Sequence, residues 1–270
     1  MKALVLGVGR MGTAIAHAMD RFGFHVVGMD TNPKAADNIP KKVNHEQTED
    51  EEGNKTIGAP RNEFFIVEDA DDICRGIAAQ EKPDVVISSL PYHQTADVAK
   101  YCIDNEIRYC DLGGRVDVSE DINEYATKNA KKPIFTDLGL APGWVNIIAE
   151  DGAKQSCPES IKMMVGGLPK NPNNYLKYNC TWSYDGLINE YKDSCEVLVN
   201  GFQTIVQGME GLELVETSLG VLEAFYTSGG AAHSVSSMQD RGVKNCYYKT
   251  LRYQGHRDAM RFLMYECGLD

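Results

Sequence analysis

The chain of 270 residues lacks any apolar run approaching the roughly 20 residues that a membrane-spanning helix needs. The apolar run after Met1 ends at Gly7, which is too short for the core of a secretory signal peptide. Basic residues are also scarce, with 27 Lys and Arg against 39 Asp and Glu and a net charge of −12. Nucleic-acid affinity depends largely on Lys and Arg that displace counterions. We therefore expect a cytoplasmic protein that binds neither nucleic acid nor membrane.

The eight cysteines include no Cys-x-x-Cys pair and are spread from Cys74 to Cys267. Dispersed cysteines in a chain of this length, without an export signal, are typical of reduced thiols rather than of a disulfide framework or a zinc site. The histidines also show no metal-ligand spacing, so the sequence predicts no metal. A hydrophobic content of 43% is typical of a globular protein. The length of 270 residues is enough for one large domain or two modest ones.

The acidic residues concentrate in one region. Residues 44–62 are polar, contain glycine and proline, and include the run Glu49–Glu52. Such a segment buries too little apolar area to fix itself, so we expect an exposed, solvated insertion, with an interaction tail as the alternative. Residues 44–72 hold ten acidic and two basic residues, so most of the net charge belongs here and says little about a binding pocket.

Short apolar runs alternate with helical patterns through the first half of the chain. We expect strands at 2–6, 24–29, 64–67, 84–88, 108–111 and 133–137, and helices at 10–22, 73–80, 93–105 and 121–130. Strands that alternate with helices of this length imply right-handed crossovers and a parallel sheet. The sequence therefore predicts an α/β domain with a doubly wound parallel sheet.

After about Pro142 the pattern changes to short strands separated by turns rich in Gly, Pro and Asn. We expect strands at 160–166, 178–183, 196–199 and 203–206, and helices at 144–153 and 215–226. The connections are too short for further βαβ units, which predicts a second, α+β domain built on a mainly antiparallel sheet. A last helix at 255–267 is expected to return to the first domain.

A glycine motif stands between the first strand and the first helix, Gly7-Val8-Gly9-Arg10-Met11-Gly12. In this position its first glycine permits a tight turn, its second lets a pyrophosphate approach, and its third allows close helix–strand packing. Asp30 ends the second strand, where a carboxylate accepts hydrogen bonds from ribose hydroxyls. A carboxylate there repels a 2′-phosphate, which favours NAD over NADP, although Arg10 and Lys34 are close enough in sequence to weaken that preference. A turn that merely requires glycine is the alternative.

Three further segments follow strand ends at the edge where open α/β sheets bind ligands. They are Ser88-Ser89-Leu90-Pro91-Tyr92-His93, Asp111-Leu112-Gly113-Gly114 and Asp137-Leu138-Gly139-Leu140-Ala141-Pro142-Gly143. The predicted cofactor contacts among them are Ser89, Leu90, Pro91, Gly113, Leu138 and Pro142. Tyr92 is predicted to cover the nicotinamide or the substrate, and Asp111 and Asp137 to act in catalysis. For the glycines and aspartates, turning the chain and capping helices is the alternative.

Longer motifs in the second half resemble the saccharopine dehydrogenase family. They are Val165–Pro169, Trp182–Tyr191, Leu222–Gly230 and Tyr248–His256, in the order of that family. The segments that begin at Asp111 and Asp137 fit it too, so the resemblance covers nearly the whole chain and is strongest to members that act on lysine itself. The acidic insertion is the main departure, and Gln254 stands where the family's last motif usually has proline.

The resemblance implies a nicotinamide-dependent oxidation at a C–N bond of an amino acid. Such chemistry needs a neutral amine, a rigid hydride geometry and anchors for the charged groups of the substrate. The candidate proton carriers are His93, His233, His256, Asp111, Asp137, Glu190 and Glu223. His233 follows a loop of small residues that begins at Thr227, and Thr227 and Trp182 are predicted to contact the substrate, with core packing as the alternative for Trp182. Glu190 and Glu223 can pair with a substrate ammonium or lie on a helix surface.

Arginines that can anchor carboxylates are few in the predicted second domain. Arg241 is the only one between Gly143 and Lys249, and Arg115 and Arg252 lie beside the predicted domain junction. Saccharopine carries three carboxylates and lysine one, so this scarcity favours a singly carboxylated substrate with Arg241 as its anchor.

Together these features predict a two-domain dehydrogenase. Residues 1–142 with the returning residues 251–270 form a Rossmann-like domain that binds NAD, and residues 143–250 bind an amino-acid substrate and form a homodimer. The predicted reaction is oxidative deamination of L-lysine at its ε-carbon to the semialdehyde, which can cyclise. Saccharopine dehydrogenase activity is the alternative, and a dinucleotide-binding sensor without turnover is an alternative of another class.

Overall fold

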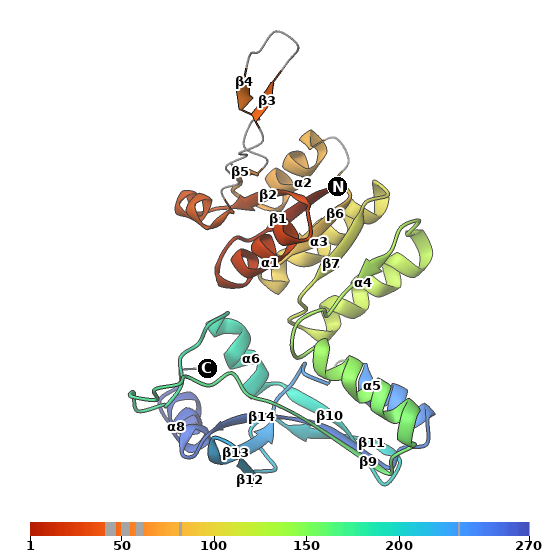
Figure 1. Cartoon of the computed structure of the whole chain (residues 1–270). Coiled ribbons are helices and arrows are strands. Elements are labelled where there is room, and N and C mark those ends of the chain that lie inside the picture. The colour runs from red at the N-terminus through yellow and green to blue at the C-terminus, as the bar shows by residue number, and fades with distance from the viewer. Residues whose placement is uncertain (41–46, 50–54, 58–61, 81–82, 232, 270) are drawn as a thin grey trace. The chain divides into compact units, whose positions relative to one another are not determined.

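The computed structural model describes residues 1–40, 47–49, 55–57, 62–80, 83–231 and 233–269 (Figure 1). The chain forms two compact units, Met1–Leu112 with Asp117–Thr136, and Gly113–Val116 with Asp137–Asp270. Each unit has hydrophobic clusters of its own, and all eight cysteines are free thiols. No helix in the described ranges is long and apolar enough to cross a bilayer.

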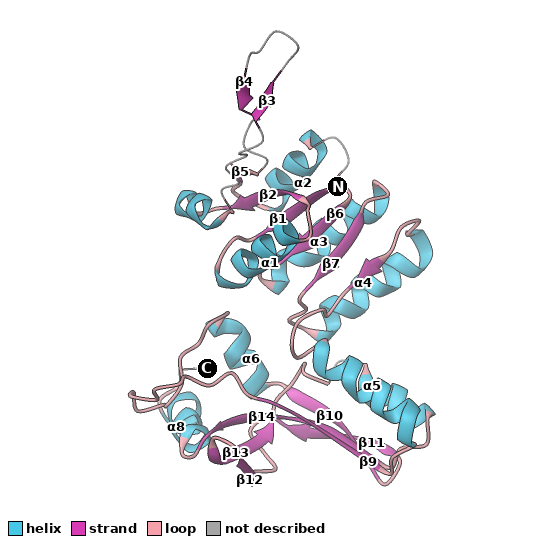
Figure 2. Cartoon of the chain, in the orientation of Figure 1, coloured by secondary structure: helices cyan, strands magenta, loops and turns pink. Residues whose placement is uncertain are grey.

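The first unit is built on a six-stranded parallel sheet in the order β5-β2-β1-β6-β7-β8 (Figure 2). Its strands are β1 (Lys2–Leu6), β2 (His25–Asp30), β5 (Glu63–Ile66), β6 (Val85–Ser88), β7 (Arg108–Asp111) and β8 (Ile134–Phe135). Its helices are α1 (Arg10–Arg21), the 3₁₀ helix η1 (Pro33–Asn38), α2 (Ala70–Ala79), α3 (Tyr92–Asp104) and α4 (Val116–Asn129). This is the strand order of a doubly wound dinucleotide-binding sheet, and the predicted fold class is confirmed.

The central strand β1 is buried on both faces. Leu4 and Leu6 pack in a cluster with side chains of α2, α3 and α4, whereas Val5 packs with Ala16 of α1 and Ala35 of η1. An uninterrupted apolar run is what a strand covered by helices on both faces requires. The strand order reverses between β1 and β6, so their carboxyl ends open the crevice in which such sheets bind ligands.

The acidic stretch predicted as an exposed loop contains a small antiparallel hairpin. Its strands are β3 (Gln47–Glu49) and β4 (Lys55–Ile57), with Gln47 opposite Ile57. The prediction of a loop is therefore wrong at these two segments. The remainder of residues 44–62, except Asn62, lies outside the described residues.

The second unit is an α+β fold on a mainly antiparallel sheet, as predicted. Its strands are β9 (Ser160–Val165), β10 (Ser194–Val199), β11 (Phe202–Gln207), β12 (Glu213–Thr217), β13 (Gly220–Tyr226) and β14 (Asn245–Tyr253). Its helices are α5 (Trp144–Ser156), α6 (Tyr184–Lys192), α7 (Ser234–Asp240), α8 (His256–Arg261) and the π-helical turn η2 (Phe262–Glu266). The long strand β14 pairs antiparallel with β10 and β13 and parallel with β9.

The elements α6, α7 and β14 were not predicted, and two segments of the second unit adopt a structure other than the predicted one. Residues 215–226, expected as a helix, form the β12–β13 hairpin, because Gly220 turns the chain at φ +95° and pairs back onto Thr217. Residues 178–183, expected as a strand, are an irregular segment that leads into α6, whose first turn is capped by the Ser183 hydroxyl. Trp182 therefore lies in this irregular segment and Tyr184 begins α6.

The C-terminal helix packs within the second unit, whereas the prediction assigned it to the first domain. Met260 and Met264 lie in one hydrophobic cluster with Leu187, Tyr191 and Phe225. The helical pattern in the sequence shows an apolar face but does not show which partner covers it. Residues 251–270 thus belong to the second unit, which begins at Asp137 and not after Pro142.

Candidate functional site

The glycine loop after β1 forms a cradle that is tight on one side and open on the other. Gly7 has φ +75°, and a Cβ on Gly12 would lie 1.8 Å from the Gly7 carbonyl oxygen. A Cβ on Gly9 would meet no atom within 4 Å. No side chain caps the amino end of α1, so its first N–H groups face the open side of the cradle. The loop therefore fits the pyrophosphate of a dinucleotide.

Asp30, at the end of β2, holds this loop in place. One carboxylate oxygen accepts a hydrogen bond from the Val8 N–H at 2.6 Å, and the other accepts one from the Asn32 N–H at 2.8 Å. Asn38 adds a bond from its amide to the Val8 carbonyl oxygen at 3.1 Å. The structure thus places Asp30 beside the glycine loop, as the ribose-binding prediction requires, and gives it a second role in shaping that loop.

Ser89 lies against the same loop. Its hydroxyl donates to the carbonyl oxygens of Leu6 and Gly7, and Leu90 and Pro91 then lead into α3. Tyr92 opens α3, with its ring edge-on to that of His93.

Asp111 ends β7 opposite Ser88 and is 2% exposed. Burial, together with the nearby charge of Asp111, raises the pKa of Tyr109 well above its usual value.

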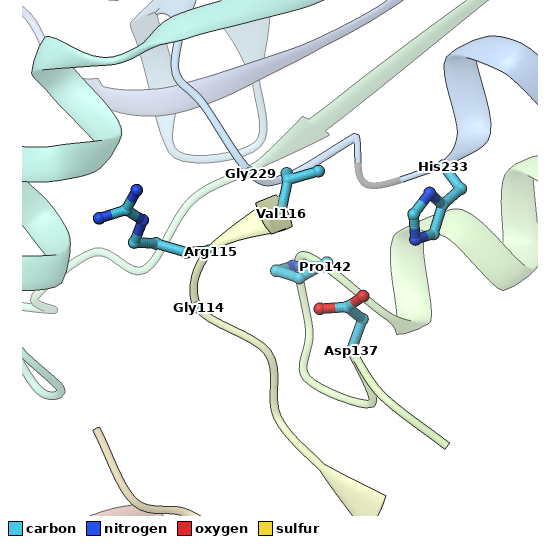
Figure 3. A pocket seen from close by; sticks show the side chains of 7 residues that line it. All are labelled: Gly114, Arg115, Val116, Asp137, Pro142, Gly229 and His233. Carbon is cyan, nitrogen blue, oxygen red and sulfur yellow. The ribbon is translucent and has the colours of Figure 1, made fainter. Parts of the chain in front are cut away.

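Asp137 and His233 line one small pocket of the second unit (Figure 3). The other lining residues are Gly114, Arg115, Val116, Pro142 and Gly229. The pocket measures about 10 Å³, which is the size of one water molecule. The side chain of Arg115 extends away from Asp137 and His233. The pocket therefore has space for about one water molecule beside Asp137 and His233, and not for a whole amino acid.

The backbone around Asp137 brings its carboxylate into this pocket. Asp137 has φ +61°, and a Cβ on Gly113 would lie 2.4 Å from its Oδ1, so only glycine permits the approach. The ring of His233, on the loop before α7, is exposed and makes no hydrogen bond with another described residue. Of the residues predicted as cofactor contacts, Gly113 thus lies against both Asp137 and Pro142, whereas Leu138 is exposed. Asp111 and Tyr92 belong to the first unit.

Asn146, which the sequence did not single out, ties the two walls of the pocket together. Its Oδ1 accepts from the Gly143 N–H at 2.7 Å. Its Nδ2 donates to the Ala231 carbonyl oxygen at 2.7 Å and lies 2.8 Å from the Ser234 hydroxyl. One side chain of α5 therefore fixes both the turn after Asp137 and the loop before His233.

The three predicted substrate contacts lie in different places. Thr227 is buried and hydrogen-bonds the Thr250 hydroxyl at 2.8 Å, and the Trp182 indole N–H donates to the Tyr178 hydroxyl at 3.3 Å. Arg241 instead donates through Nε to Glu150 at 3.0 Å and lines a separate hollow beside Cys157. The Arg241 guanidinium already has a carboxylate partner within the protein. Its role as an anchor for a substrate carboxylate stays a prediction.

Arg252 forms a buried polar cluster with Tyr178, Tyr191 and His256. It is 4% exposed, donates through Nε to the Tyr191 hydroxyl at 2.9 Å, and its guanidinium carbon lies 4.4 Å from the centre of the Tyr178 ring. Burial lowers the pKa of His256 to about 4, so the ring is neutral at pH 7. Its Nδ1 then donates to the Leu176 carbonyl oxygen, and its Nε2 accepts from Tyr191. His256 is accordingly a packing residue of this cluster.

Glu223 also has a structural role. Its two carboxylate oxygens accept from the backbone N–H groups of Gly255 at 2.9 Å and Arg257 at 2.5 Å, which caps the amino end of α8. Of the two glutamates considered from the sequence, Glu190 is the one left for a ligand.

The carboxyl of Glu190, on α6, is half-buried and makes no hydrogen bond or ion pair with another described residue. Burial raises its pKa to about 8, against the lowering effect of Arg252. The other titratable groups that interact with it are Tyr178, Tyr191, Tyr248 and Cys195. Glu190 is thus mostly protonated at pH 7.

This carboxyl makes the protein less stable as the pH rises. Between its ordinary pKa of 4.5 and its pKa of about 8, the folded chain holds the Glu190 proton more tightly than the unfolded chain, so the free energy of unfolding falls. His256 acts in the opposite direction, but only between pH 4 and 6.5. We expect the free energy of unfolding to fall by at most about 2 kcal/mol between pH 6.5 and 8, and we expect this fall to be smaller in Glu190→Gln. Urea unfolding at several pH values in this range measures the free energy of unfolding. The same dependence on pH in the wild type and in Glu190→Gln would contradict the prediction.

Two family models together match nearly the whole chain. The saccharopine dehydrogenase NADP binding domain matches residues 3–135, and the saccharopine dehydrogenase C-terminal domain matches residues 139–269. The chain therefore belongs to the saccharopine dehydrogenase family. The junction between the two matches coincides with the start of the second unit at Asp137, and the second match includes the C-terminal helix.

Relatives in this family are longer than the chain. A mitochondrial alpha-aminoadipic semialdehyde synthase of Mus musculus is 27% identical over 67% of this chain and 20% of its own length. An L-glutamate-forming, NADP(+) saccharopine dehydrogenase of Schizosaccharomyces pombe is 25% identical over 77% of this chain and 48% of its own. The apo saccharopine dehydrogenase of Saccharomyces cerevisiae shares the fold, with a TM-score of 0.69 and 17% identity over 97% of this chain and 57% of that one.

Proposed function

We propose that this chain is an NAD-dependent dehydrogenase that oxidises L-lysine at its ε-carbon to the semialdehyde and releases ammonium. The observation that carries the proposal is the pocket lined by the Asp137 carboxylate and the His233 imidazole, whose ring has no hydrogen-bond partner among the described residues. Such a pair can take a proton from an amine, which an ammonium must lose before it can give up hydride. The glycine cradle of the first unit supports a dinucleotide as the oxidant.

In this reaction the chain moves protons and positions groups. The ε-amine of lysine is protonated at neutral pH, so Asp137 or His233 first accepts a proton from the ammonium. Bound nicotinamide supplies the acceptor for the hydride that leaves the ε-carbon. Water then adds to the resulting iminium carbon, the same pair removes its proton, and ammonia leaves after receiving a proton. The loop fixed by Asn146 keeps the pair in place through these steps.

Lysine is favoured over a tricarboxylate by the cations of the second unit. Arg241 pairs with Glu150 and Lys249 with Glu213, whereas Arg252 is buried with no ion pair to a described carboxylate. One such guanidinium suits one carboxylate. The second candidate is saccharopine dehydrogenase activity, and the observation that favours it is the similarity to the saccharopine dehydrogenase of Schizosaccharomyces pombe.

The test is the appearance of reduced cofactor when the purified chain receives NAD and a single amino acid. We expect reduction with L-lysine alone and equimolar release of ammonium. Reduction with saccharopine and none with lysine would assign the second candidate. Binding of NAD with no turnover of either amino acid would indicate a dinucleotide-binding sensor and not an enzyme.

Replacement of Asp30 tests the preference for NAD. Asp30→Asn keeps an oxygen that can accept from the Val8 N–H, loses the acceptor used by the Asn32 N–H, and removes the charge that repels a 2′-phosphate. We expect NAD to bind about tenfold or more weakly, because hydrogen bonds from ribose hydroxyls to a carboxylate are lost, and NADP to bind more tightly. Calorimetry with both dinucleotides measures this. Asp37→Asn, on the surface of η1, is the matched control, and an unchanged ratio of affinities in Asp30→Asn would refute the assignment.

A further inference from the structure

Arg252 is a buried cation that forms no ion pair with any described carboxylate. Its guanidinium donates to one hydroxyl and to the Leu251 carbonyl oxygen at 2.9 Å, and it faces the Tyr178 ring. No described carboxylate lies within ion-pair distance of it, and the Nη2 group has no hydrogen-bond partner among the described residues. A buried charge left in this state is costly unless a ligand compensates it. The unused edge of the guanidinium is therefore suited to a carboxylate.

Glu190 is close enough to Arg252 for each to affect the other electrostatically, yet the two form no ion pair. The Glu190 carboxyl, like Nη2, lacks a protein partner among the described residues. The side chains come from different elements, α6 and β14. A cation and an acid that affect each other without forming an ion pair suit a ligand that carries both opposite charges.

The loop from Thr227 to Gly230 connects this pair to the pocket of Asp137 and His233. The Glu190 carbonyl oxygen accepts from the Ser228 N–H at 2.9 Å, and Thr227 hydrogen-bonds Thr250, two residues before Arg252. At the other end, Gly229 lines the pocket, and a Cβ on Gly230 would lie 2.2 Å from the Tyr248 ring. A single short loop therefore borders both the proton-carrying pocket and the Arg252–Glu190 pair.

From this geometry we propose that Arg252 and Glu190 together bind the α-amino-acid head of the substrate, with Arg252 on the α-carboxylate and Glu190 on the α-ammonium. The assignment rests on the proposed function in taking the substrate to be an α-amino acid. Because Glu190 is mostly protonated at pH 7, an ammonium that binds there displaces its proton. Binding of the head is then coupled to proton release. Arg241 remains the competing anchor for the carboxylate.

Three ligands without an ε-amine separate recognition of the head from oxidation. L-norleucine carries both head charges, hexanoate only the carboxylate and pentylamine only the ammonium. In the full chain we expect norleucine to bind at least about tenfold more tightly than either, since each charged contact contributes about 1.5 kcal/mol or more. Calorimetry in two buffers of different ionisation enthalpy should show a proton released with norleucine at pH 7.

The variants assign each charge to its residue. In Arg252→Lys, norleucine should no longer bind more tightly than pentylamine. In Glu190→Gln, norleucine should no longer bind more tightly than hexanoate, and its binding should no longer release a proton. Arg261→Lys, another arginine over a tyrosine ring of the same unit, is the matched control and should change neither. Glu190→Gln is nearly isosteric, so it tests the proposal even if Arg252→Lys fails to fold.

The outcomes also distinguish this proposal from the proposed function. If lysine is not oxidised but norleucine shows this selectivity, the proposed function fails and recognition of the head stands. If lysine is oxidised while the three ligands bind equally, or while both variants weaken all three to the same extent, recognition of the head by this pair is overturned. Loss of the norleucine advantage in Arg241→Gln, and not in Arg252→Lys, would also overturn it.

Discussion

Gly12→Ala should destabilise the first unit by about 3 kcal/mol or more, whereas Gly9→Ala should leave its stability unchanged and abolish tight dinucleotide binding. The two glycines are three residues apart but meet opposite surroundings. A Cβ on Gly12 would lie 1.8 Å from the Gly7 carbonyl oxygen and 2.8 Å from the Ser89 hydroxyl, so α1 must move away from β1. A Cβ on Gly9 meets no protein atom and enters the space that a pyrophosphate needs.

Urea unfolding and calorimetry with NAD measure the two effects separately. Gly152→Ala in α5 is the matched control, because its new methyl group also meets no atom within 4 Å and there is no phosphate to obstruct. That change should stabilise the helix by up to about 1 kcal/mol and leave NAD binding unchanged. Wild-type stability in Gly12→Ala, or wild-type NAD affinity in Gly9→Ala, would contradict the assignment of the cradle.

Asp137→Asn and His233→Gln should each lower kcat for the amine oxidation by about 10²–10⁴-fold while NAD affinity is unchanged. Both substitutions preserve side-chain size but remove a group that can take a proton in the pocket. Since the two act on the same proton, the double variant should be little slower than the slower single one. A stopped-flow measurement of cofactor reduction, with calorimetry for NAD, separates the chemical step from binding.

The control for this pair is Asp151→Asn on α5, where the exposed carboxylate accepts a hydrogen bond from Gln155. It should have wild-type kcat and wild-type stability. If His233→Gln also has wild-type kcat while Asp137→Asn does not, the imidazole is not the proton carrier. A fall in kcat accompanied by an equal fall in NAD affinity in both variants would instead assign these residues to cofactor binding.

The parts of the site that could be predicted from sequence are those in which neighbouring residues determine the geometry. The glycine loop lies between a strand and a helix in consecutive residues, and Asp30 ends the next strand, so short-range rules suffice. The pocket of Asp137 could not be predicted from neighbouring residues alone, because the approach of its carboxylate depends on Gly113, 24 positions earlier. The resemblance to a family identified both segments but not their contact.

Arg252 and Glu190 show why the rest could not be predicted. Along β14 the alternate residues Cys246, Tyr248, Thr250 and Arg252 are all buried, and such a pattern indicates an inward face. An arginine at the end of that face has no visible partner in the sequence, since the hydroxyl that it contacts is 61 residues away. The helix wrongly predicted over 215–226 has a similar origin, because its apolar residues suit either element and only the turn at Gly220 decides.

The positions of the two central strands along the chain have a consequence for how the protein is made. In the first unit, β1 is the first strand to leave the ribosome, and its partners β2 and β6 can add to it as they emerge. In the second unit, β14 joins β9, β10 and β13 but is the last strand to be synthesised. The nascent second unit therefore exposes unpaired strand edges until β14 arrives, and this is the stage at which aggregation or chaperone binding is expected during translation.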